Sequence, residues 1–289
     1  MSRPGEVSIV IPCYNLGQFL GETVSSIEAA RSPSLREVVI VDDGSTEPRT
    51  IEVLDDLRKR GYSMIRQPNR GVSAARNAGI RATTGRYVLP VDSDNRIRRP
   101  YLTDAVRLLD TDKSVGVVYG DAEYYGERHG RWRVDEFSLS RLIIHNYIDS
   151  CALFRREMWE ELGGYDERMP YFGWEDWDLW LRAALRGWRF AHLPEVAFDY
   201  RVRPGSLLQQ ANERAAVIDA YMFSKDEFAS IARLRPELHR LWIIEQSMEY
   251  RLGRRLLSPI RRAAARFHRA SASQTADPVR KPVSSIVEK

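Results

Sequence analysis

Residues 38–45 carry the sequence VVIVDDGS, in which four apolar residues lead directly into two acids and a turn. An apolar run without polar alternation is typical of a strand that is covered on both faces, as in a parallel sheet. The Asp-Gly pair behind it is a common turn signal, so Asp42 and Asp43 have a plain role as turn residues. They also stand at the carboxyl end of a strand, where parallel sheets bind their ligands.

The segments on either side repeat the same alternation of strand and helix. Apolar residues are continuous in the expected strands and recur at helical spacing in the expected helices. This order predicts an α/β fold with a Rossmann-like, mostly parallel sheet and helices on both faces. The expected elements are strands at 7–11, 38–41, 64–65 and 87–91 and helices at 16–30, 50–60 and 73–82.

Polar side chains follow each of these four strands. Asn15 comes after the first strand, Asp42 after the second, Asn69 after the third and Asp92 after the fourth. Because the carboxyl ends of parallel strands meet at one edge of a sheet, we expect a phosphorylated nucleotide and its cation there. The chain has neither GxGxxG nor GxxxxGK[ST], which argues against a dinucleotide-binding fold and a P-loop ATPase. A diphosphate would therefore be held by a metal and by arginine.

The composition is that of an ordinary folded protein. The 289 residues are 43% hydrophobic and 29% charged, which excludes disordered, collagen-like and coiled-coil chains. No apolar run approaches the length of about 18 residues that spans a membrane, and no signal peptide precedes the first strand, so a cytoplasmic protein is expected. Cys13 and Cys151 are isolated and the five histidines lack metal-binding spacing. We therefore expect no metal site built from Cys or His.

Five motifs, taken in order, resemble those of glycosyltransferase family 2 with the GT-A fold. They are VSIVIPCYN at 7–15, VDDGST at 41–46, NRGVSAARNAG at 69–79, DSD at 92–94 and WED at 174–176. The resemblance implies an inverting transfer of a sugar from a nucleoside diphosphate, usually UDP, to an acceptor hydroxyl. The expected setting is synthesis of a cell-surface polysaccharide or glycolipid, with a saccharide or lipid-linked acceptor. Two alternatives stay open: a GT-A-like nucleotidyltransferase and a non-catalytic nucleotide-sugar-binding protein.

The resemblance assigns the sugar donor to the strand ends of the first half of the chain. It implies that Asp42 accepts a hydrogen bond from the base and that Tyr14 packs on the base or ribose. Arg76 has a plain alternative as a solvated surface arginine. The full set of implied donor-binding residues is Pro12, Tyr14, Asn15, Asp42, Asn69, Arg76, Asp92, Ser93 and Arg203.

Asp92 and Asp94 form the DxD element of the resembled family. Two carboxylates one residue apart at a strand end direct oxygen ligands towards one point, which suits Mg²⁺ or Mn²⁺ on a diphosphate. The resemblance makes Asp94 the direct metal ligand and places Asp92 at the ribose and metal. Arg203 stands where many members have a histidine. Arginine cannot ligate a cation, but it can pair with phosphate oxygens.

Residues 173–180, GWEDWDLW, predict the start of a helix with a buried tryptophan stripe. Glu175 and Asp176 fall in its first turn, where the helix dipole favours an ionised carboxylate and where an N-cap role is the structural alternative for Asp176. The resemblance instead implies that Asp176 is the base that deprotonates the acceptor hydroxyl, with Asp178 as the fallback. The expected acceptor contacts are Trp174, Glu175, Asp149 and Tyr147.

The predicted organisation is a GT-A domain at 1–210 with a helical C-terminal extension. The domain divides into a nucleotide-binding half at 1–95 and an acceptor half at 96–210. Within the acceptor half we expect a polar, mobile excursion at 121–145. The extension covers 211–270, and a tail that is expected to be disordered covers 271–289.

Basic charge is concentrated at the C-terminal end. Residues 251–289 hold ten basic and two acidic residues, whereas the rest of the chain holds 34 and 38. Residues 251–269 combine arginines with apolar residues at helical spacing, a pattern typical of a helix that lies peripherally on an anionic membrane face. The alternative is a basic helix packed on the acidic body or in an oligomer interface. Nucleic acid is not expected as a partner, because aromatic residues are few in this segment.

Overall fold

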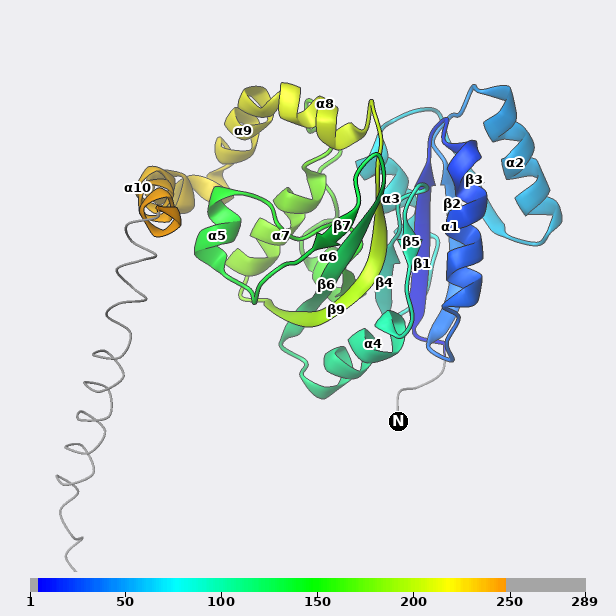
Figure 1. The fold of residues 1–289 in the computed structure, drawn as a ribbon, viewed down its shortest axis with the longest axis horizontal. Helices are drawn as coiled ribbons and strands as arrows, with labels where there is room; N and C mark the ends of the chain where they lie inside the picture. The colour runs from blue at the N-terminus through cyan, green and yellow to red at the C-terminus, as the bar shows by residue number, and fades with distance from the viewer. Residues whose placement is uncertain (1–4, 248–289) are drawn as a thin grey trace, which may run out of the picture. The chain divides into compact units, whose positions relative to one another are not determined.

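The computed structural model describes residues 5–247 (Figure 1). Its strands are β1 Val7–Cys13, β2 Leu35–Asp42, β3 Ser63–Arg66, β4 Tyr87–Pro90, β5 Arg96–Ile97, β6 Val115–Gly126, β7 Gly130–Trp132, β8 Leu153–Arg155 and β9 Arg189–Val202. Its helices are α1 Gly17–Ala29, α2 Pro48–Lys59, α3 Val72–Arg81, α4 Tyr101–Thr111, α5 Leu139–Ile144, α6 Arg156–Glu161, α7 Glu175–Leu185, α8 Leu207–Glu213, α9 Ala215–Phe223 and α10 Ala229–Gln246. The strands and helices predicted for residues 7–91 are all confirmed.

The described strands form one sheet whose long ladders are parallel. Its order is β3-β2-β1-β4-β8-β6-β9-β5, and β7 pairs with β6. β1 runs parallel to β2 and β4, and β6 runs parallel to β9 from Val115 to Gly126. The short strand β8 is antiparallel to both β4 and β6 and joins the two parallel parts. The predicted mostly parallel α/β sheet is therefore confirmed.

The chain changes its winding direction at β1. It proceeds from β1 outward to β2 and β3 and then returns to pair β4 on the other side of β1. In open α/β sheets the crevice at such a switch point, outside the carboxyl ends of the strands, is where ligands bind. Tyr14 follows β1 and Asp92 follows β4, so the sheet order delivers both to this crevice.

Both faces of the β1 region are covered by helices. Ile9 and Ile11 belong to one core with Leu20 of α1 and with residues of α4. On the opposite face α3 approaches so closely that a Cβ added to Gly79 would lie 2.4 Å from Val10 Cγ1. Successive residues of β1 point to opposite faces of the sheet, and both faces are covered. Every position of β1 is therefore buried, which explains its continuous apolar sequence.

The structure corrects the prediction for residues 121–145. β6 continues to Gly126, the chain turns back through β7, and α5 follows, so most of this range is strand or helix and not an irregular excursion. The reason lies in the partner strand. β6 remains paired with β9 as far as the Gly126–Val202 pair, which satisfies its backbone although its side chains are mixed in character.

Beyond β9 the described chain is helical. The extension predicted from residue 211 is helical where the structure describes it: α8 ends at Glu213, and α9 begins at Ala215. The compact unit that contains the sheet ends at Arg235, and residues 236–247 belong to a second unit. The arginine-rich segment 251–269 and the tail 271–289 lie outside the described residues. Among the helices between residues 5 and 247, none is both long and apolar enough to span a bilayer.

Candidate active site

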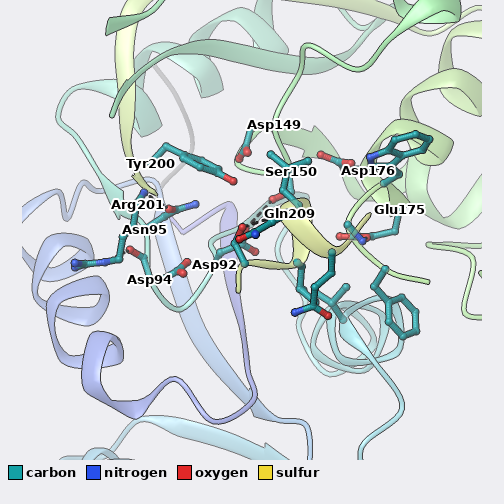
Figure 2. A pocket seen from close by; sticks show the side chains of 18 of the residues that line it. Asp92, Asp94, Asn95, Asp149, Ser150, Glu175, Asp176, Tyr200, Arg201 and Gln209 are labelled. Atoms are coloured by element: carbon teal, nitrogen blue, oxygen red, sulfur yellow. Dashed lines mark hydrogen bonds between the residues drawn. The ribbon is translucent and has the colours of Figure 1, made fainter. Parts of the chain in front are cut away.

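A cavity of about 1400 Å³ opens at the carboxyl ends of β1 and β4. It extends to the N-terminus of α7 and to the end of β9, so both halves of the chain contribute to its wall. Figure 2 shows the acidic side chains that surround it. The acids that the figure labels are Asp92, Asp94, Asp149, Glu175 and Asp176, and the lining also includes Asp43, Glu127 and Glu213. The structure thus brings the DSD and WED motifs to one space.

Asp92 and Asp94 lie on the loop that follows β4. The loop is fixed from α1, where the Thr23 hydroxyl is 2.9 Å from the carbonyl oxygen of Ser93. Arg203, directly after β9, donates a 2.6 Å hydrogen bond from Nε to Asp94 Oδ2. Burial raises the pKa of Asp94 and the charge of Asp92 raises it further, while Arg203 lowers it. Burial, together with the neighbouring carboxylate, therefore outweighs the effect of the arginine on this pKa.

Arg76 of α3 connects the two acidic motifs. Its Nη2 donates to Asp92 Oδ1 at 2.7 Å and its Nη1 donates to Glu175 Oε1 at 2.5 Å. Arg76 is 2% exposed, so the alternative of a solvated surface arginine is wrong. Burial lowers the pKa of Arg76, but Asp92 and Glu175 more than offset this and hold the pKa well above its usual value. The guanidinium is thus a fixed positive charge between the loop after β4 and the start of α7.

Glu175 and Asp176 begin α7. Glu175 is held by Arg76 and by the backbone N–H of Gly173, which donates to Oε2 at 2.6 Å. Trp174 occupies the N-cap position of α7, so the N-cap alternative for Asp176 is wrong, and Asp176 Oδ1 accepts from the Trp177 backbone N–H at 2.7 Å from within the first turn. Burial, and then the charges of Glu175 and Asp149, raise the pKa of Asp176 well above its ordinary value. The helix dipole, which would favour an ionised carboxylate, is outweighed here.

The tryptophans of α7 fix the wall of the cavity. Trp177 is buried, as predicted, and its Nε1 donates to the Leu142 carbonyl at 2.6 Å. Trp180 is also buried, and its Nε1 donates to the Ile148 carbonyl at 3.1 Å. Trp174 is half-buried and lines the cavity. The helix that carries Asp176 thereby anchors the segment that carries Asp149.

Asp149 faces the cavity from the loop before β8. Its Oδ1 accepts a 2.8 Å hydrogen bond from the Cys151 backbone N–H. Burial, followed by the charge of Asp92, raises the pKa of Asp149 to about 7. Tyr147 also lines the cavity, but its hydroxyl accepts from the Ser138 backbone N–H at 2.8 Å and so supports the loop. The second carboxyl oxygen of Asp149 therefore remains for a ligand in the cavity, whereas the Tyr147 hydroxyl is engaged by the loop.

The residues predicted to bind the donor divide into two groups. Asn15 and Asp42 do not line the cavity. Asn15 Oδ1 accepts from the Thr46 backbone N–H at 2.8 Å, and Asp42 forms an ion pair with Arg66 at 3.3 Å. The base-reading role of Asp42 stays a prediction. The predicted residues that do line the cavity are Pro12, Tyr14, Asn69, Arg76, Asp92, Ser93 and Arg203.

Asp43 lines the cavity although the motif comparison favoured its neighbour. Its Oδ1 accepts from the Arg70 backbone N–H at 3.0 Å and its Oδ2 accepts from that of Gly71 at 2.8 Å. It therefore positions the loop before α3. In a strand successive side chains point to opposite faces, so the alternation at the end of β2 is the signal that separates Asp42 from Asp43.

Asp178, the fallback base, lies outside the cavity lining. Its side chain is fully buried and pairs with Arg182 Nε at 2.8 Å and with Lys225 Nζ at 2.5 Å. Both carboxyl oxygens are thus engaged, one by Arg182 within α7 and the other by Lys225 in the segment after α9. Asp176 alone of these two acids is available to the cavity.

Comparison with protein families decides the relationship. The model described as glycosyl transferase family 2 matches residues 8–163, and the one described as glycosyltransferase like family 2 matches residues 134–233. The chain belongs to glycosyltransferase family 2. The resemblance seen in the motifs is thereby confirmed.

Curated members of the family show similar sequences over most of the chain. Glycosyltransferase GlyA of Streptococcus pneumoniae is 31% identical over 74% of this chain and 33% of its own length. Succinoglycan biosynthesis protein ExoO of Rhizobium meliloti is 28% identical over 77% of this chain and 68% of its own. Hyaluronan synthase of Pasteurella multocida is 26% identical over 69% of this chain and 21% of its own. The chain thus spans a third or less of two of these relatives.

Solved structures of the family share the fold. TarS of S. aureus in complex with UDP-GlcNAc superposes with a TM-score of 0.63 at 22% identity, over 81% of this chain and 71% of that one. Mannosyltransferase PcManGT of Pyrobaculum calidifontis, in complex with GDP-Man and Mn²⁺, has a TM-score of 0.61 at 23% identity, over 96% and 81%. The GT-A fold is confirmed, with helices at its C-terminal end.

The side chains of the DSD motif can supply only some of the ligands that a divalent cation needs. Among the described residues no group of three or more His, Cys, Asp or Glu is arranged to enclose a metal. Asp92 and Asp94 each have one oxygen engaged by an arginine, at 2.7 and 2.6 Å, and the second oxygen of Asp92 accepts a long hydrogen bond of 3.5 Å from the Ser150 hydroxyl. Two carboxylates with one oxygen each suit a cation that takes its other ligands from phosphate oxygens and water, as Mg²⁺ does.

Proposed function

We propose that this chain is an inverting glycosyltransferase that moves a sugar from a nucleoside-diphosphate sugar to an acceptor hydroxyl. The first candidate donor is a UDP-sugar. The observation that carries the proposal is the presence of Asp176 in the same cavity as Asp92 and Asp94. One acid is a candidate base, and the other two are candidate holders of the donor. The UDP-GlcNAc complex of TarS and the name of ExoO support a nucleotide-sugar donor and a role in polysaccharide or glycolipid synthesis.

The donor fits the side of the cavity formed by the first half of the chain. Tyr14, which is 45% exposed, and Asn69 present an aromatic ring and an amide to a base or ribose. Asp92 and Asp94 would hold Mn²⁺ or Mg²⁺, which when bound would neutralise charge on the leaving diphosphate. The Mn²⁺ complex of PcManGT supports this assignment.

Arg203 stands at the position where many members of the family have a histidine. In the described structure it pairs with Asp94. A guanidinium at this position is able to pair with a diphosphate oxygen when Asp94 turns to a cation, because arginine donates to phosphate through several N–H groups. It would thus exchange one anionic partner for another.

Asp176 would accept the proton of the acceptor hydroxyl. As the acceptor oxygen bonds to the anomeric carbon, the bond from that carbon to the diphosphate oxygen breaks and the hydroxyl proton moves to the Asp176 carboxylate. A single displacement of this kind inverts the anomeric configuration. The raised pKa of Asp176 makes its ionised form a stronger base than an exposed aspartate, at the cost of needing a higher pH to ionise.

The first test is release of nucleoside diphosphate from UDP-, GDP- and dTDP-sugars by the purified chain. Asp176→Asn should keep donor binding and lower turnover by on the order of 10²-fold or more, as expected when a positioned base is removed. Glu195→Gln, the same change at an exposed carboxylate outside the cavity, is the matched control and should leave turnover unchanged. Equal turnover by Asp176→Asn and the unmodified chain would refute the assigned base. A second assay, with a nucleoside triphosphate and a sugar 1-phosphate as substrates, tests the alternative: release of pyrophosphate there, without release of nucleoside diphosphate from the nucleotide sugars, would identify a nucleotidyltransferase.

A further inference from the structure

Three aromatic side chains from neighbouring strands meet on one wall of the cavity. They are Tyr124 of β6, Trp132 of β7 and Tyr200 of β9, called here the aromatic cluster. Tyr124 is directly opposite Tyr200 in the parallel ladder, and Trp132 is opposite Ala122, two residues from Tyr124 on the same face. Because side chains two residues apart share a face of a sheet, the strands themselves bring the rings together.

The rings form a compact surface. Tyr124 and Trp132 are stacked at an interplanar angle of 2° with centroids 5.8 Å apart. Tyr200 stands nearly perpendicular to both, at centroid distances of 6.0 and 5.8 Å. All three side chains are half-buried. Their mutual contacts fix the rings, so the part of each ring that faces the cavity is a preformed apolar surface.

The polar atoms of these rings are not used by the fold. Among the described residues, none forms a hydrogen bond with the Tyr124 or Tyr200 hydroxyl or with Trp132 Nε1, and none of the three atoms is enclosed away from solvent. Tyr and Trp polar groups that serve packing alone find protein partners when they are buried. The same face of the cavity thus offers aromatic carbon together with three free hydrogen-bonding groups.

The aromatic cluster adjoins the reacting groups. Figure 2 shows the Tyr200 ring pointing towards Asp149 and Ser150. Burial, and then the charges of Asp149, Asp92, Asp94 and Asp176, raise the pKa of Tyr200, which reflects how near its hydroxyl lies to these acids. One end of a ligand bound to the aromatic cluster therefore lies beside these carboxylates.

From this arrangement we propose that the aromatic cluster is the acceptor subsite and binds a neutral pyranose. A pyranose presents an apolar C–H face to an aromatic ring and hydroxyls at its edge, which match the free polar groups of Tyr124, Trp132 and Tyr200. At the end of the cluster next to Asp149 and Asp92 an anionic group is disfavoured, because it would bring a further negative charge to these carboxylates. Positive charge is supplied at Tyr124, where the Arg128 guanidinium lies 4.1 Å from the ring centroid. The inference rests on the proposed function, in which the other substrate is the nucleotide sugar.

The test separates acceptor binding from donor binding. Transfer from the donor that the chain uses is measured with p-nitrophenyl β-glucoside, β-galactoside, β-N-acetylglucosaminide and β-glucuronide as acceptors. Trp132→Ala should raise the acceptor KM about tenfold and leave the donor KM within about twofold. Trp132→Phe should retain most of the affinity, and Tyr200→Phe should raise the acceptor KM while its ring remains. The glucuronide should be the poorest acceptor of the four.

Phe137→Ala is the matched control. Phe137 is a half-buried aromatic residue of the same region that stacks on Phe190 at 4.4 Å and does not line the cavity. Its removal should leave the acceptor KM unchanged. An unchanged acceptor KM in Trp132→Ala, or a rise of the donor KM equal to that of the acceptor KM, would overturn the proposal. The second result would mean that the cluster holds the donor sugar.

Binding without turnover distinguishes failure of the subsite from failure of the proposed function. Saturation-transfer NMR with methyl β-glucoside and methyl β-galactoside should show contact with the unmodified chain and a loss of contact in Trp132→Ala. If no nucleotide sugar is consumed but this contact is seen, the proposed function fails and the saccharide subsite stands. If donor is consumed but neither methyl glycoside nor any of the four acceptors binds, the subsite fails and the proposed function stands.

Discussion

Arg76 is the residue on which the two halves of the site depend. Sequence alone favoured a nucleotide contact or a solvated side chain for it. Its actual position between Asp92 and Glu175 follows from the meeting of α3, β4 and α7, and α7 is distant in the chain. No local pattern reveals such a contact, since spacing within a helix says nothing about a partner that the tertiary fold supplies.

Replacing Arg76 should change both the pH profile and the stability. Arg76 lowers the pKa of Asp176, against the burial that raises it. Arg76→Gln should therefore raise this pKa further, so that activity is lost at a higher pH as the solution is acidified. It also leaves the buried carboxylate of Glu175 and the half-buried carboxylate of Asp92 without their partner, and loss of the buried pair should cost on the order of 3–5 kcal/mol of unfolding free energy. The measurements are kcat/KM against pH for diphosphate release, and urea unfolding.

Arg76→Lys serves as the control for this change. Lysine keeps the positive charge but cannot reach two carboxylates with a planar fork. The acid side of its pH profile should stay closer to that of the unmodified chain than the profile of Arg76→Gln. Identical pH profiles for Gln and Lys would contradict an electrostatic role of Arg76 towards Asp176.

Asp94 provides a test of the cation. Asp94→Ala should weaken donor binding by about tenfold or more in Mn²⁺ or Mg²⁺ and should have little effect in EDTA, because only the metal-bound donor uses this carboxylate. Calorimetric titration with UDP measures both conditions. Donor binding and turnover by the unmodified chain that are indifferent to EDTA would show that Arg203 carries the charge of the diphosphate without a cation.

At the level of elements, the first half of the chain was predictable and the second half was less so. β1 and β2 are continuous apolar runs because both faces are covered, and such runs are visible in sequence. β8 has only three residues and α5 and α6 have six each, too few for periodicity to appear. β9 includes Arg189, Glu195 and Asp199. Its strand conformation comes from the long pairing with β6, which no local pattern indicates.

The close approach of α3 to the sheet can be tested at Gly79. A Cβ at this position would lie 2.4 Å from Val10 Cγ1 and 3.0 Å from Val41 Cγ2. Gly79→Ala should therefore destabilise the fold by roughly 1–3 kcal/mol, the usual cost of overpacking, in spite of the better helix propensity of alanine. Urea unfolding gives the change.

Gly21 in α1 is the matched glycine. A Cβ added there meets nothing within 4 Å, so Gly21→Ala should stabilise the chain by up to about 1 kcal/mol through helix propensity alone. The opposite signs of the two substitutions are the expected result. A stabilising Gly79→Ala would show that α3 stands farther from β1 than described.

At the scale of the whole molecule, charge is divided unevenly. Residues 1–250 carry more acidic than basic residues, whereas residues 251–289 are strongly basic. We expect the full chain to sediment with anionic vesicles at low salt, because each basic residue near such a surface contributes about 1 kcal/mol. Truncation after Tyr250 should abolish this binding. Equal recovery of both forms, or no binding of either, would favour a basic helix that packs on the acidic body or in an oligomer.

The long strand β9 has a consequence for how acceptor preference can change. Its alternation gives Tyr200 to the aromatic cluster, while the next residue, Arg201, donates from its backbone N–H to Asn95 Oδ1 at 3.0 Å beside the DSD motif. An insertion or deletion in β9 would exchange these faces and disturb both substrates at once. The turn between β6 and β7 carries Glu127, Arg128 and His129, all exposed. Its Arg128 lies over the Tyr124 ring of the aromatic cluster, and its link to β9 is a backbone hydrogen bond from Glu127 to Val202, which does not depend on the side chains of the turn. We therefore expect acceptor preference to change through this hairpin more readily than through β9, in evolution or in the laboratory. Exchanging the β6–β7 turn is a route to altered acceptors that leaves donor binding unchanged.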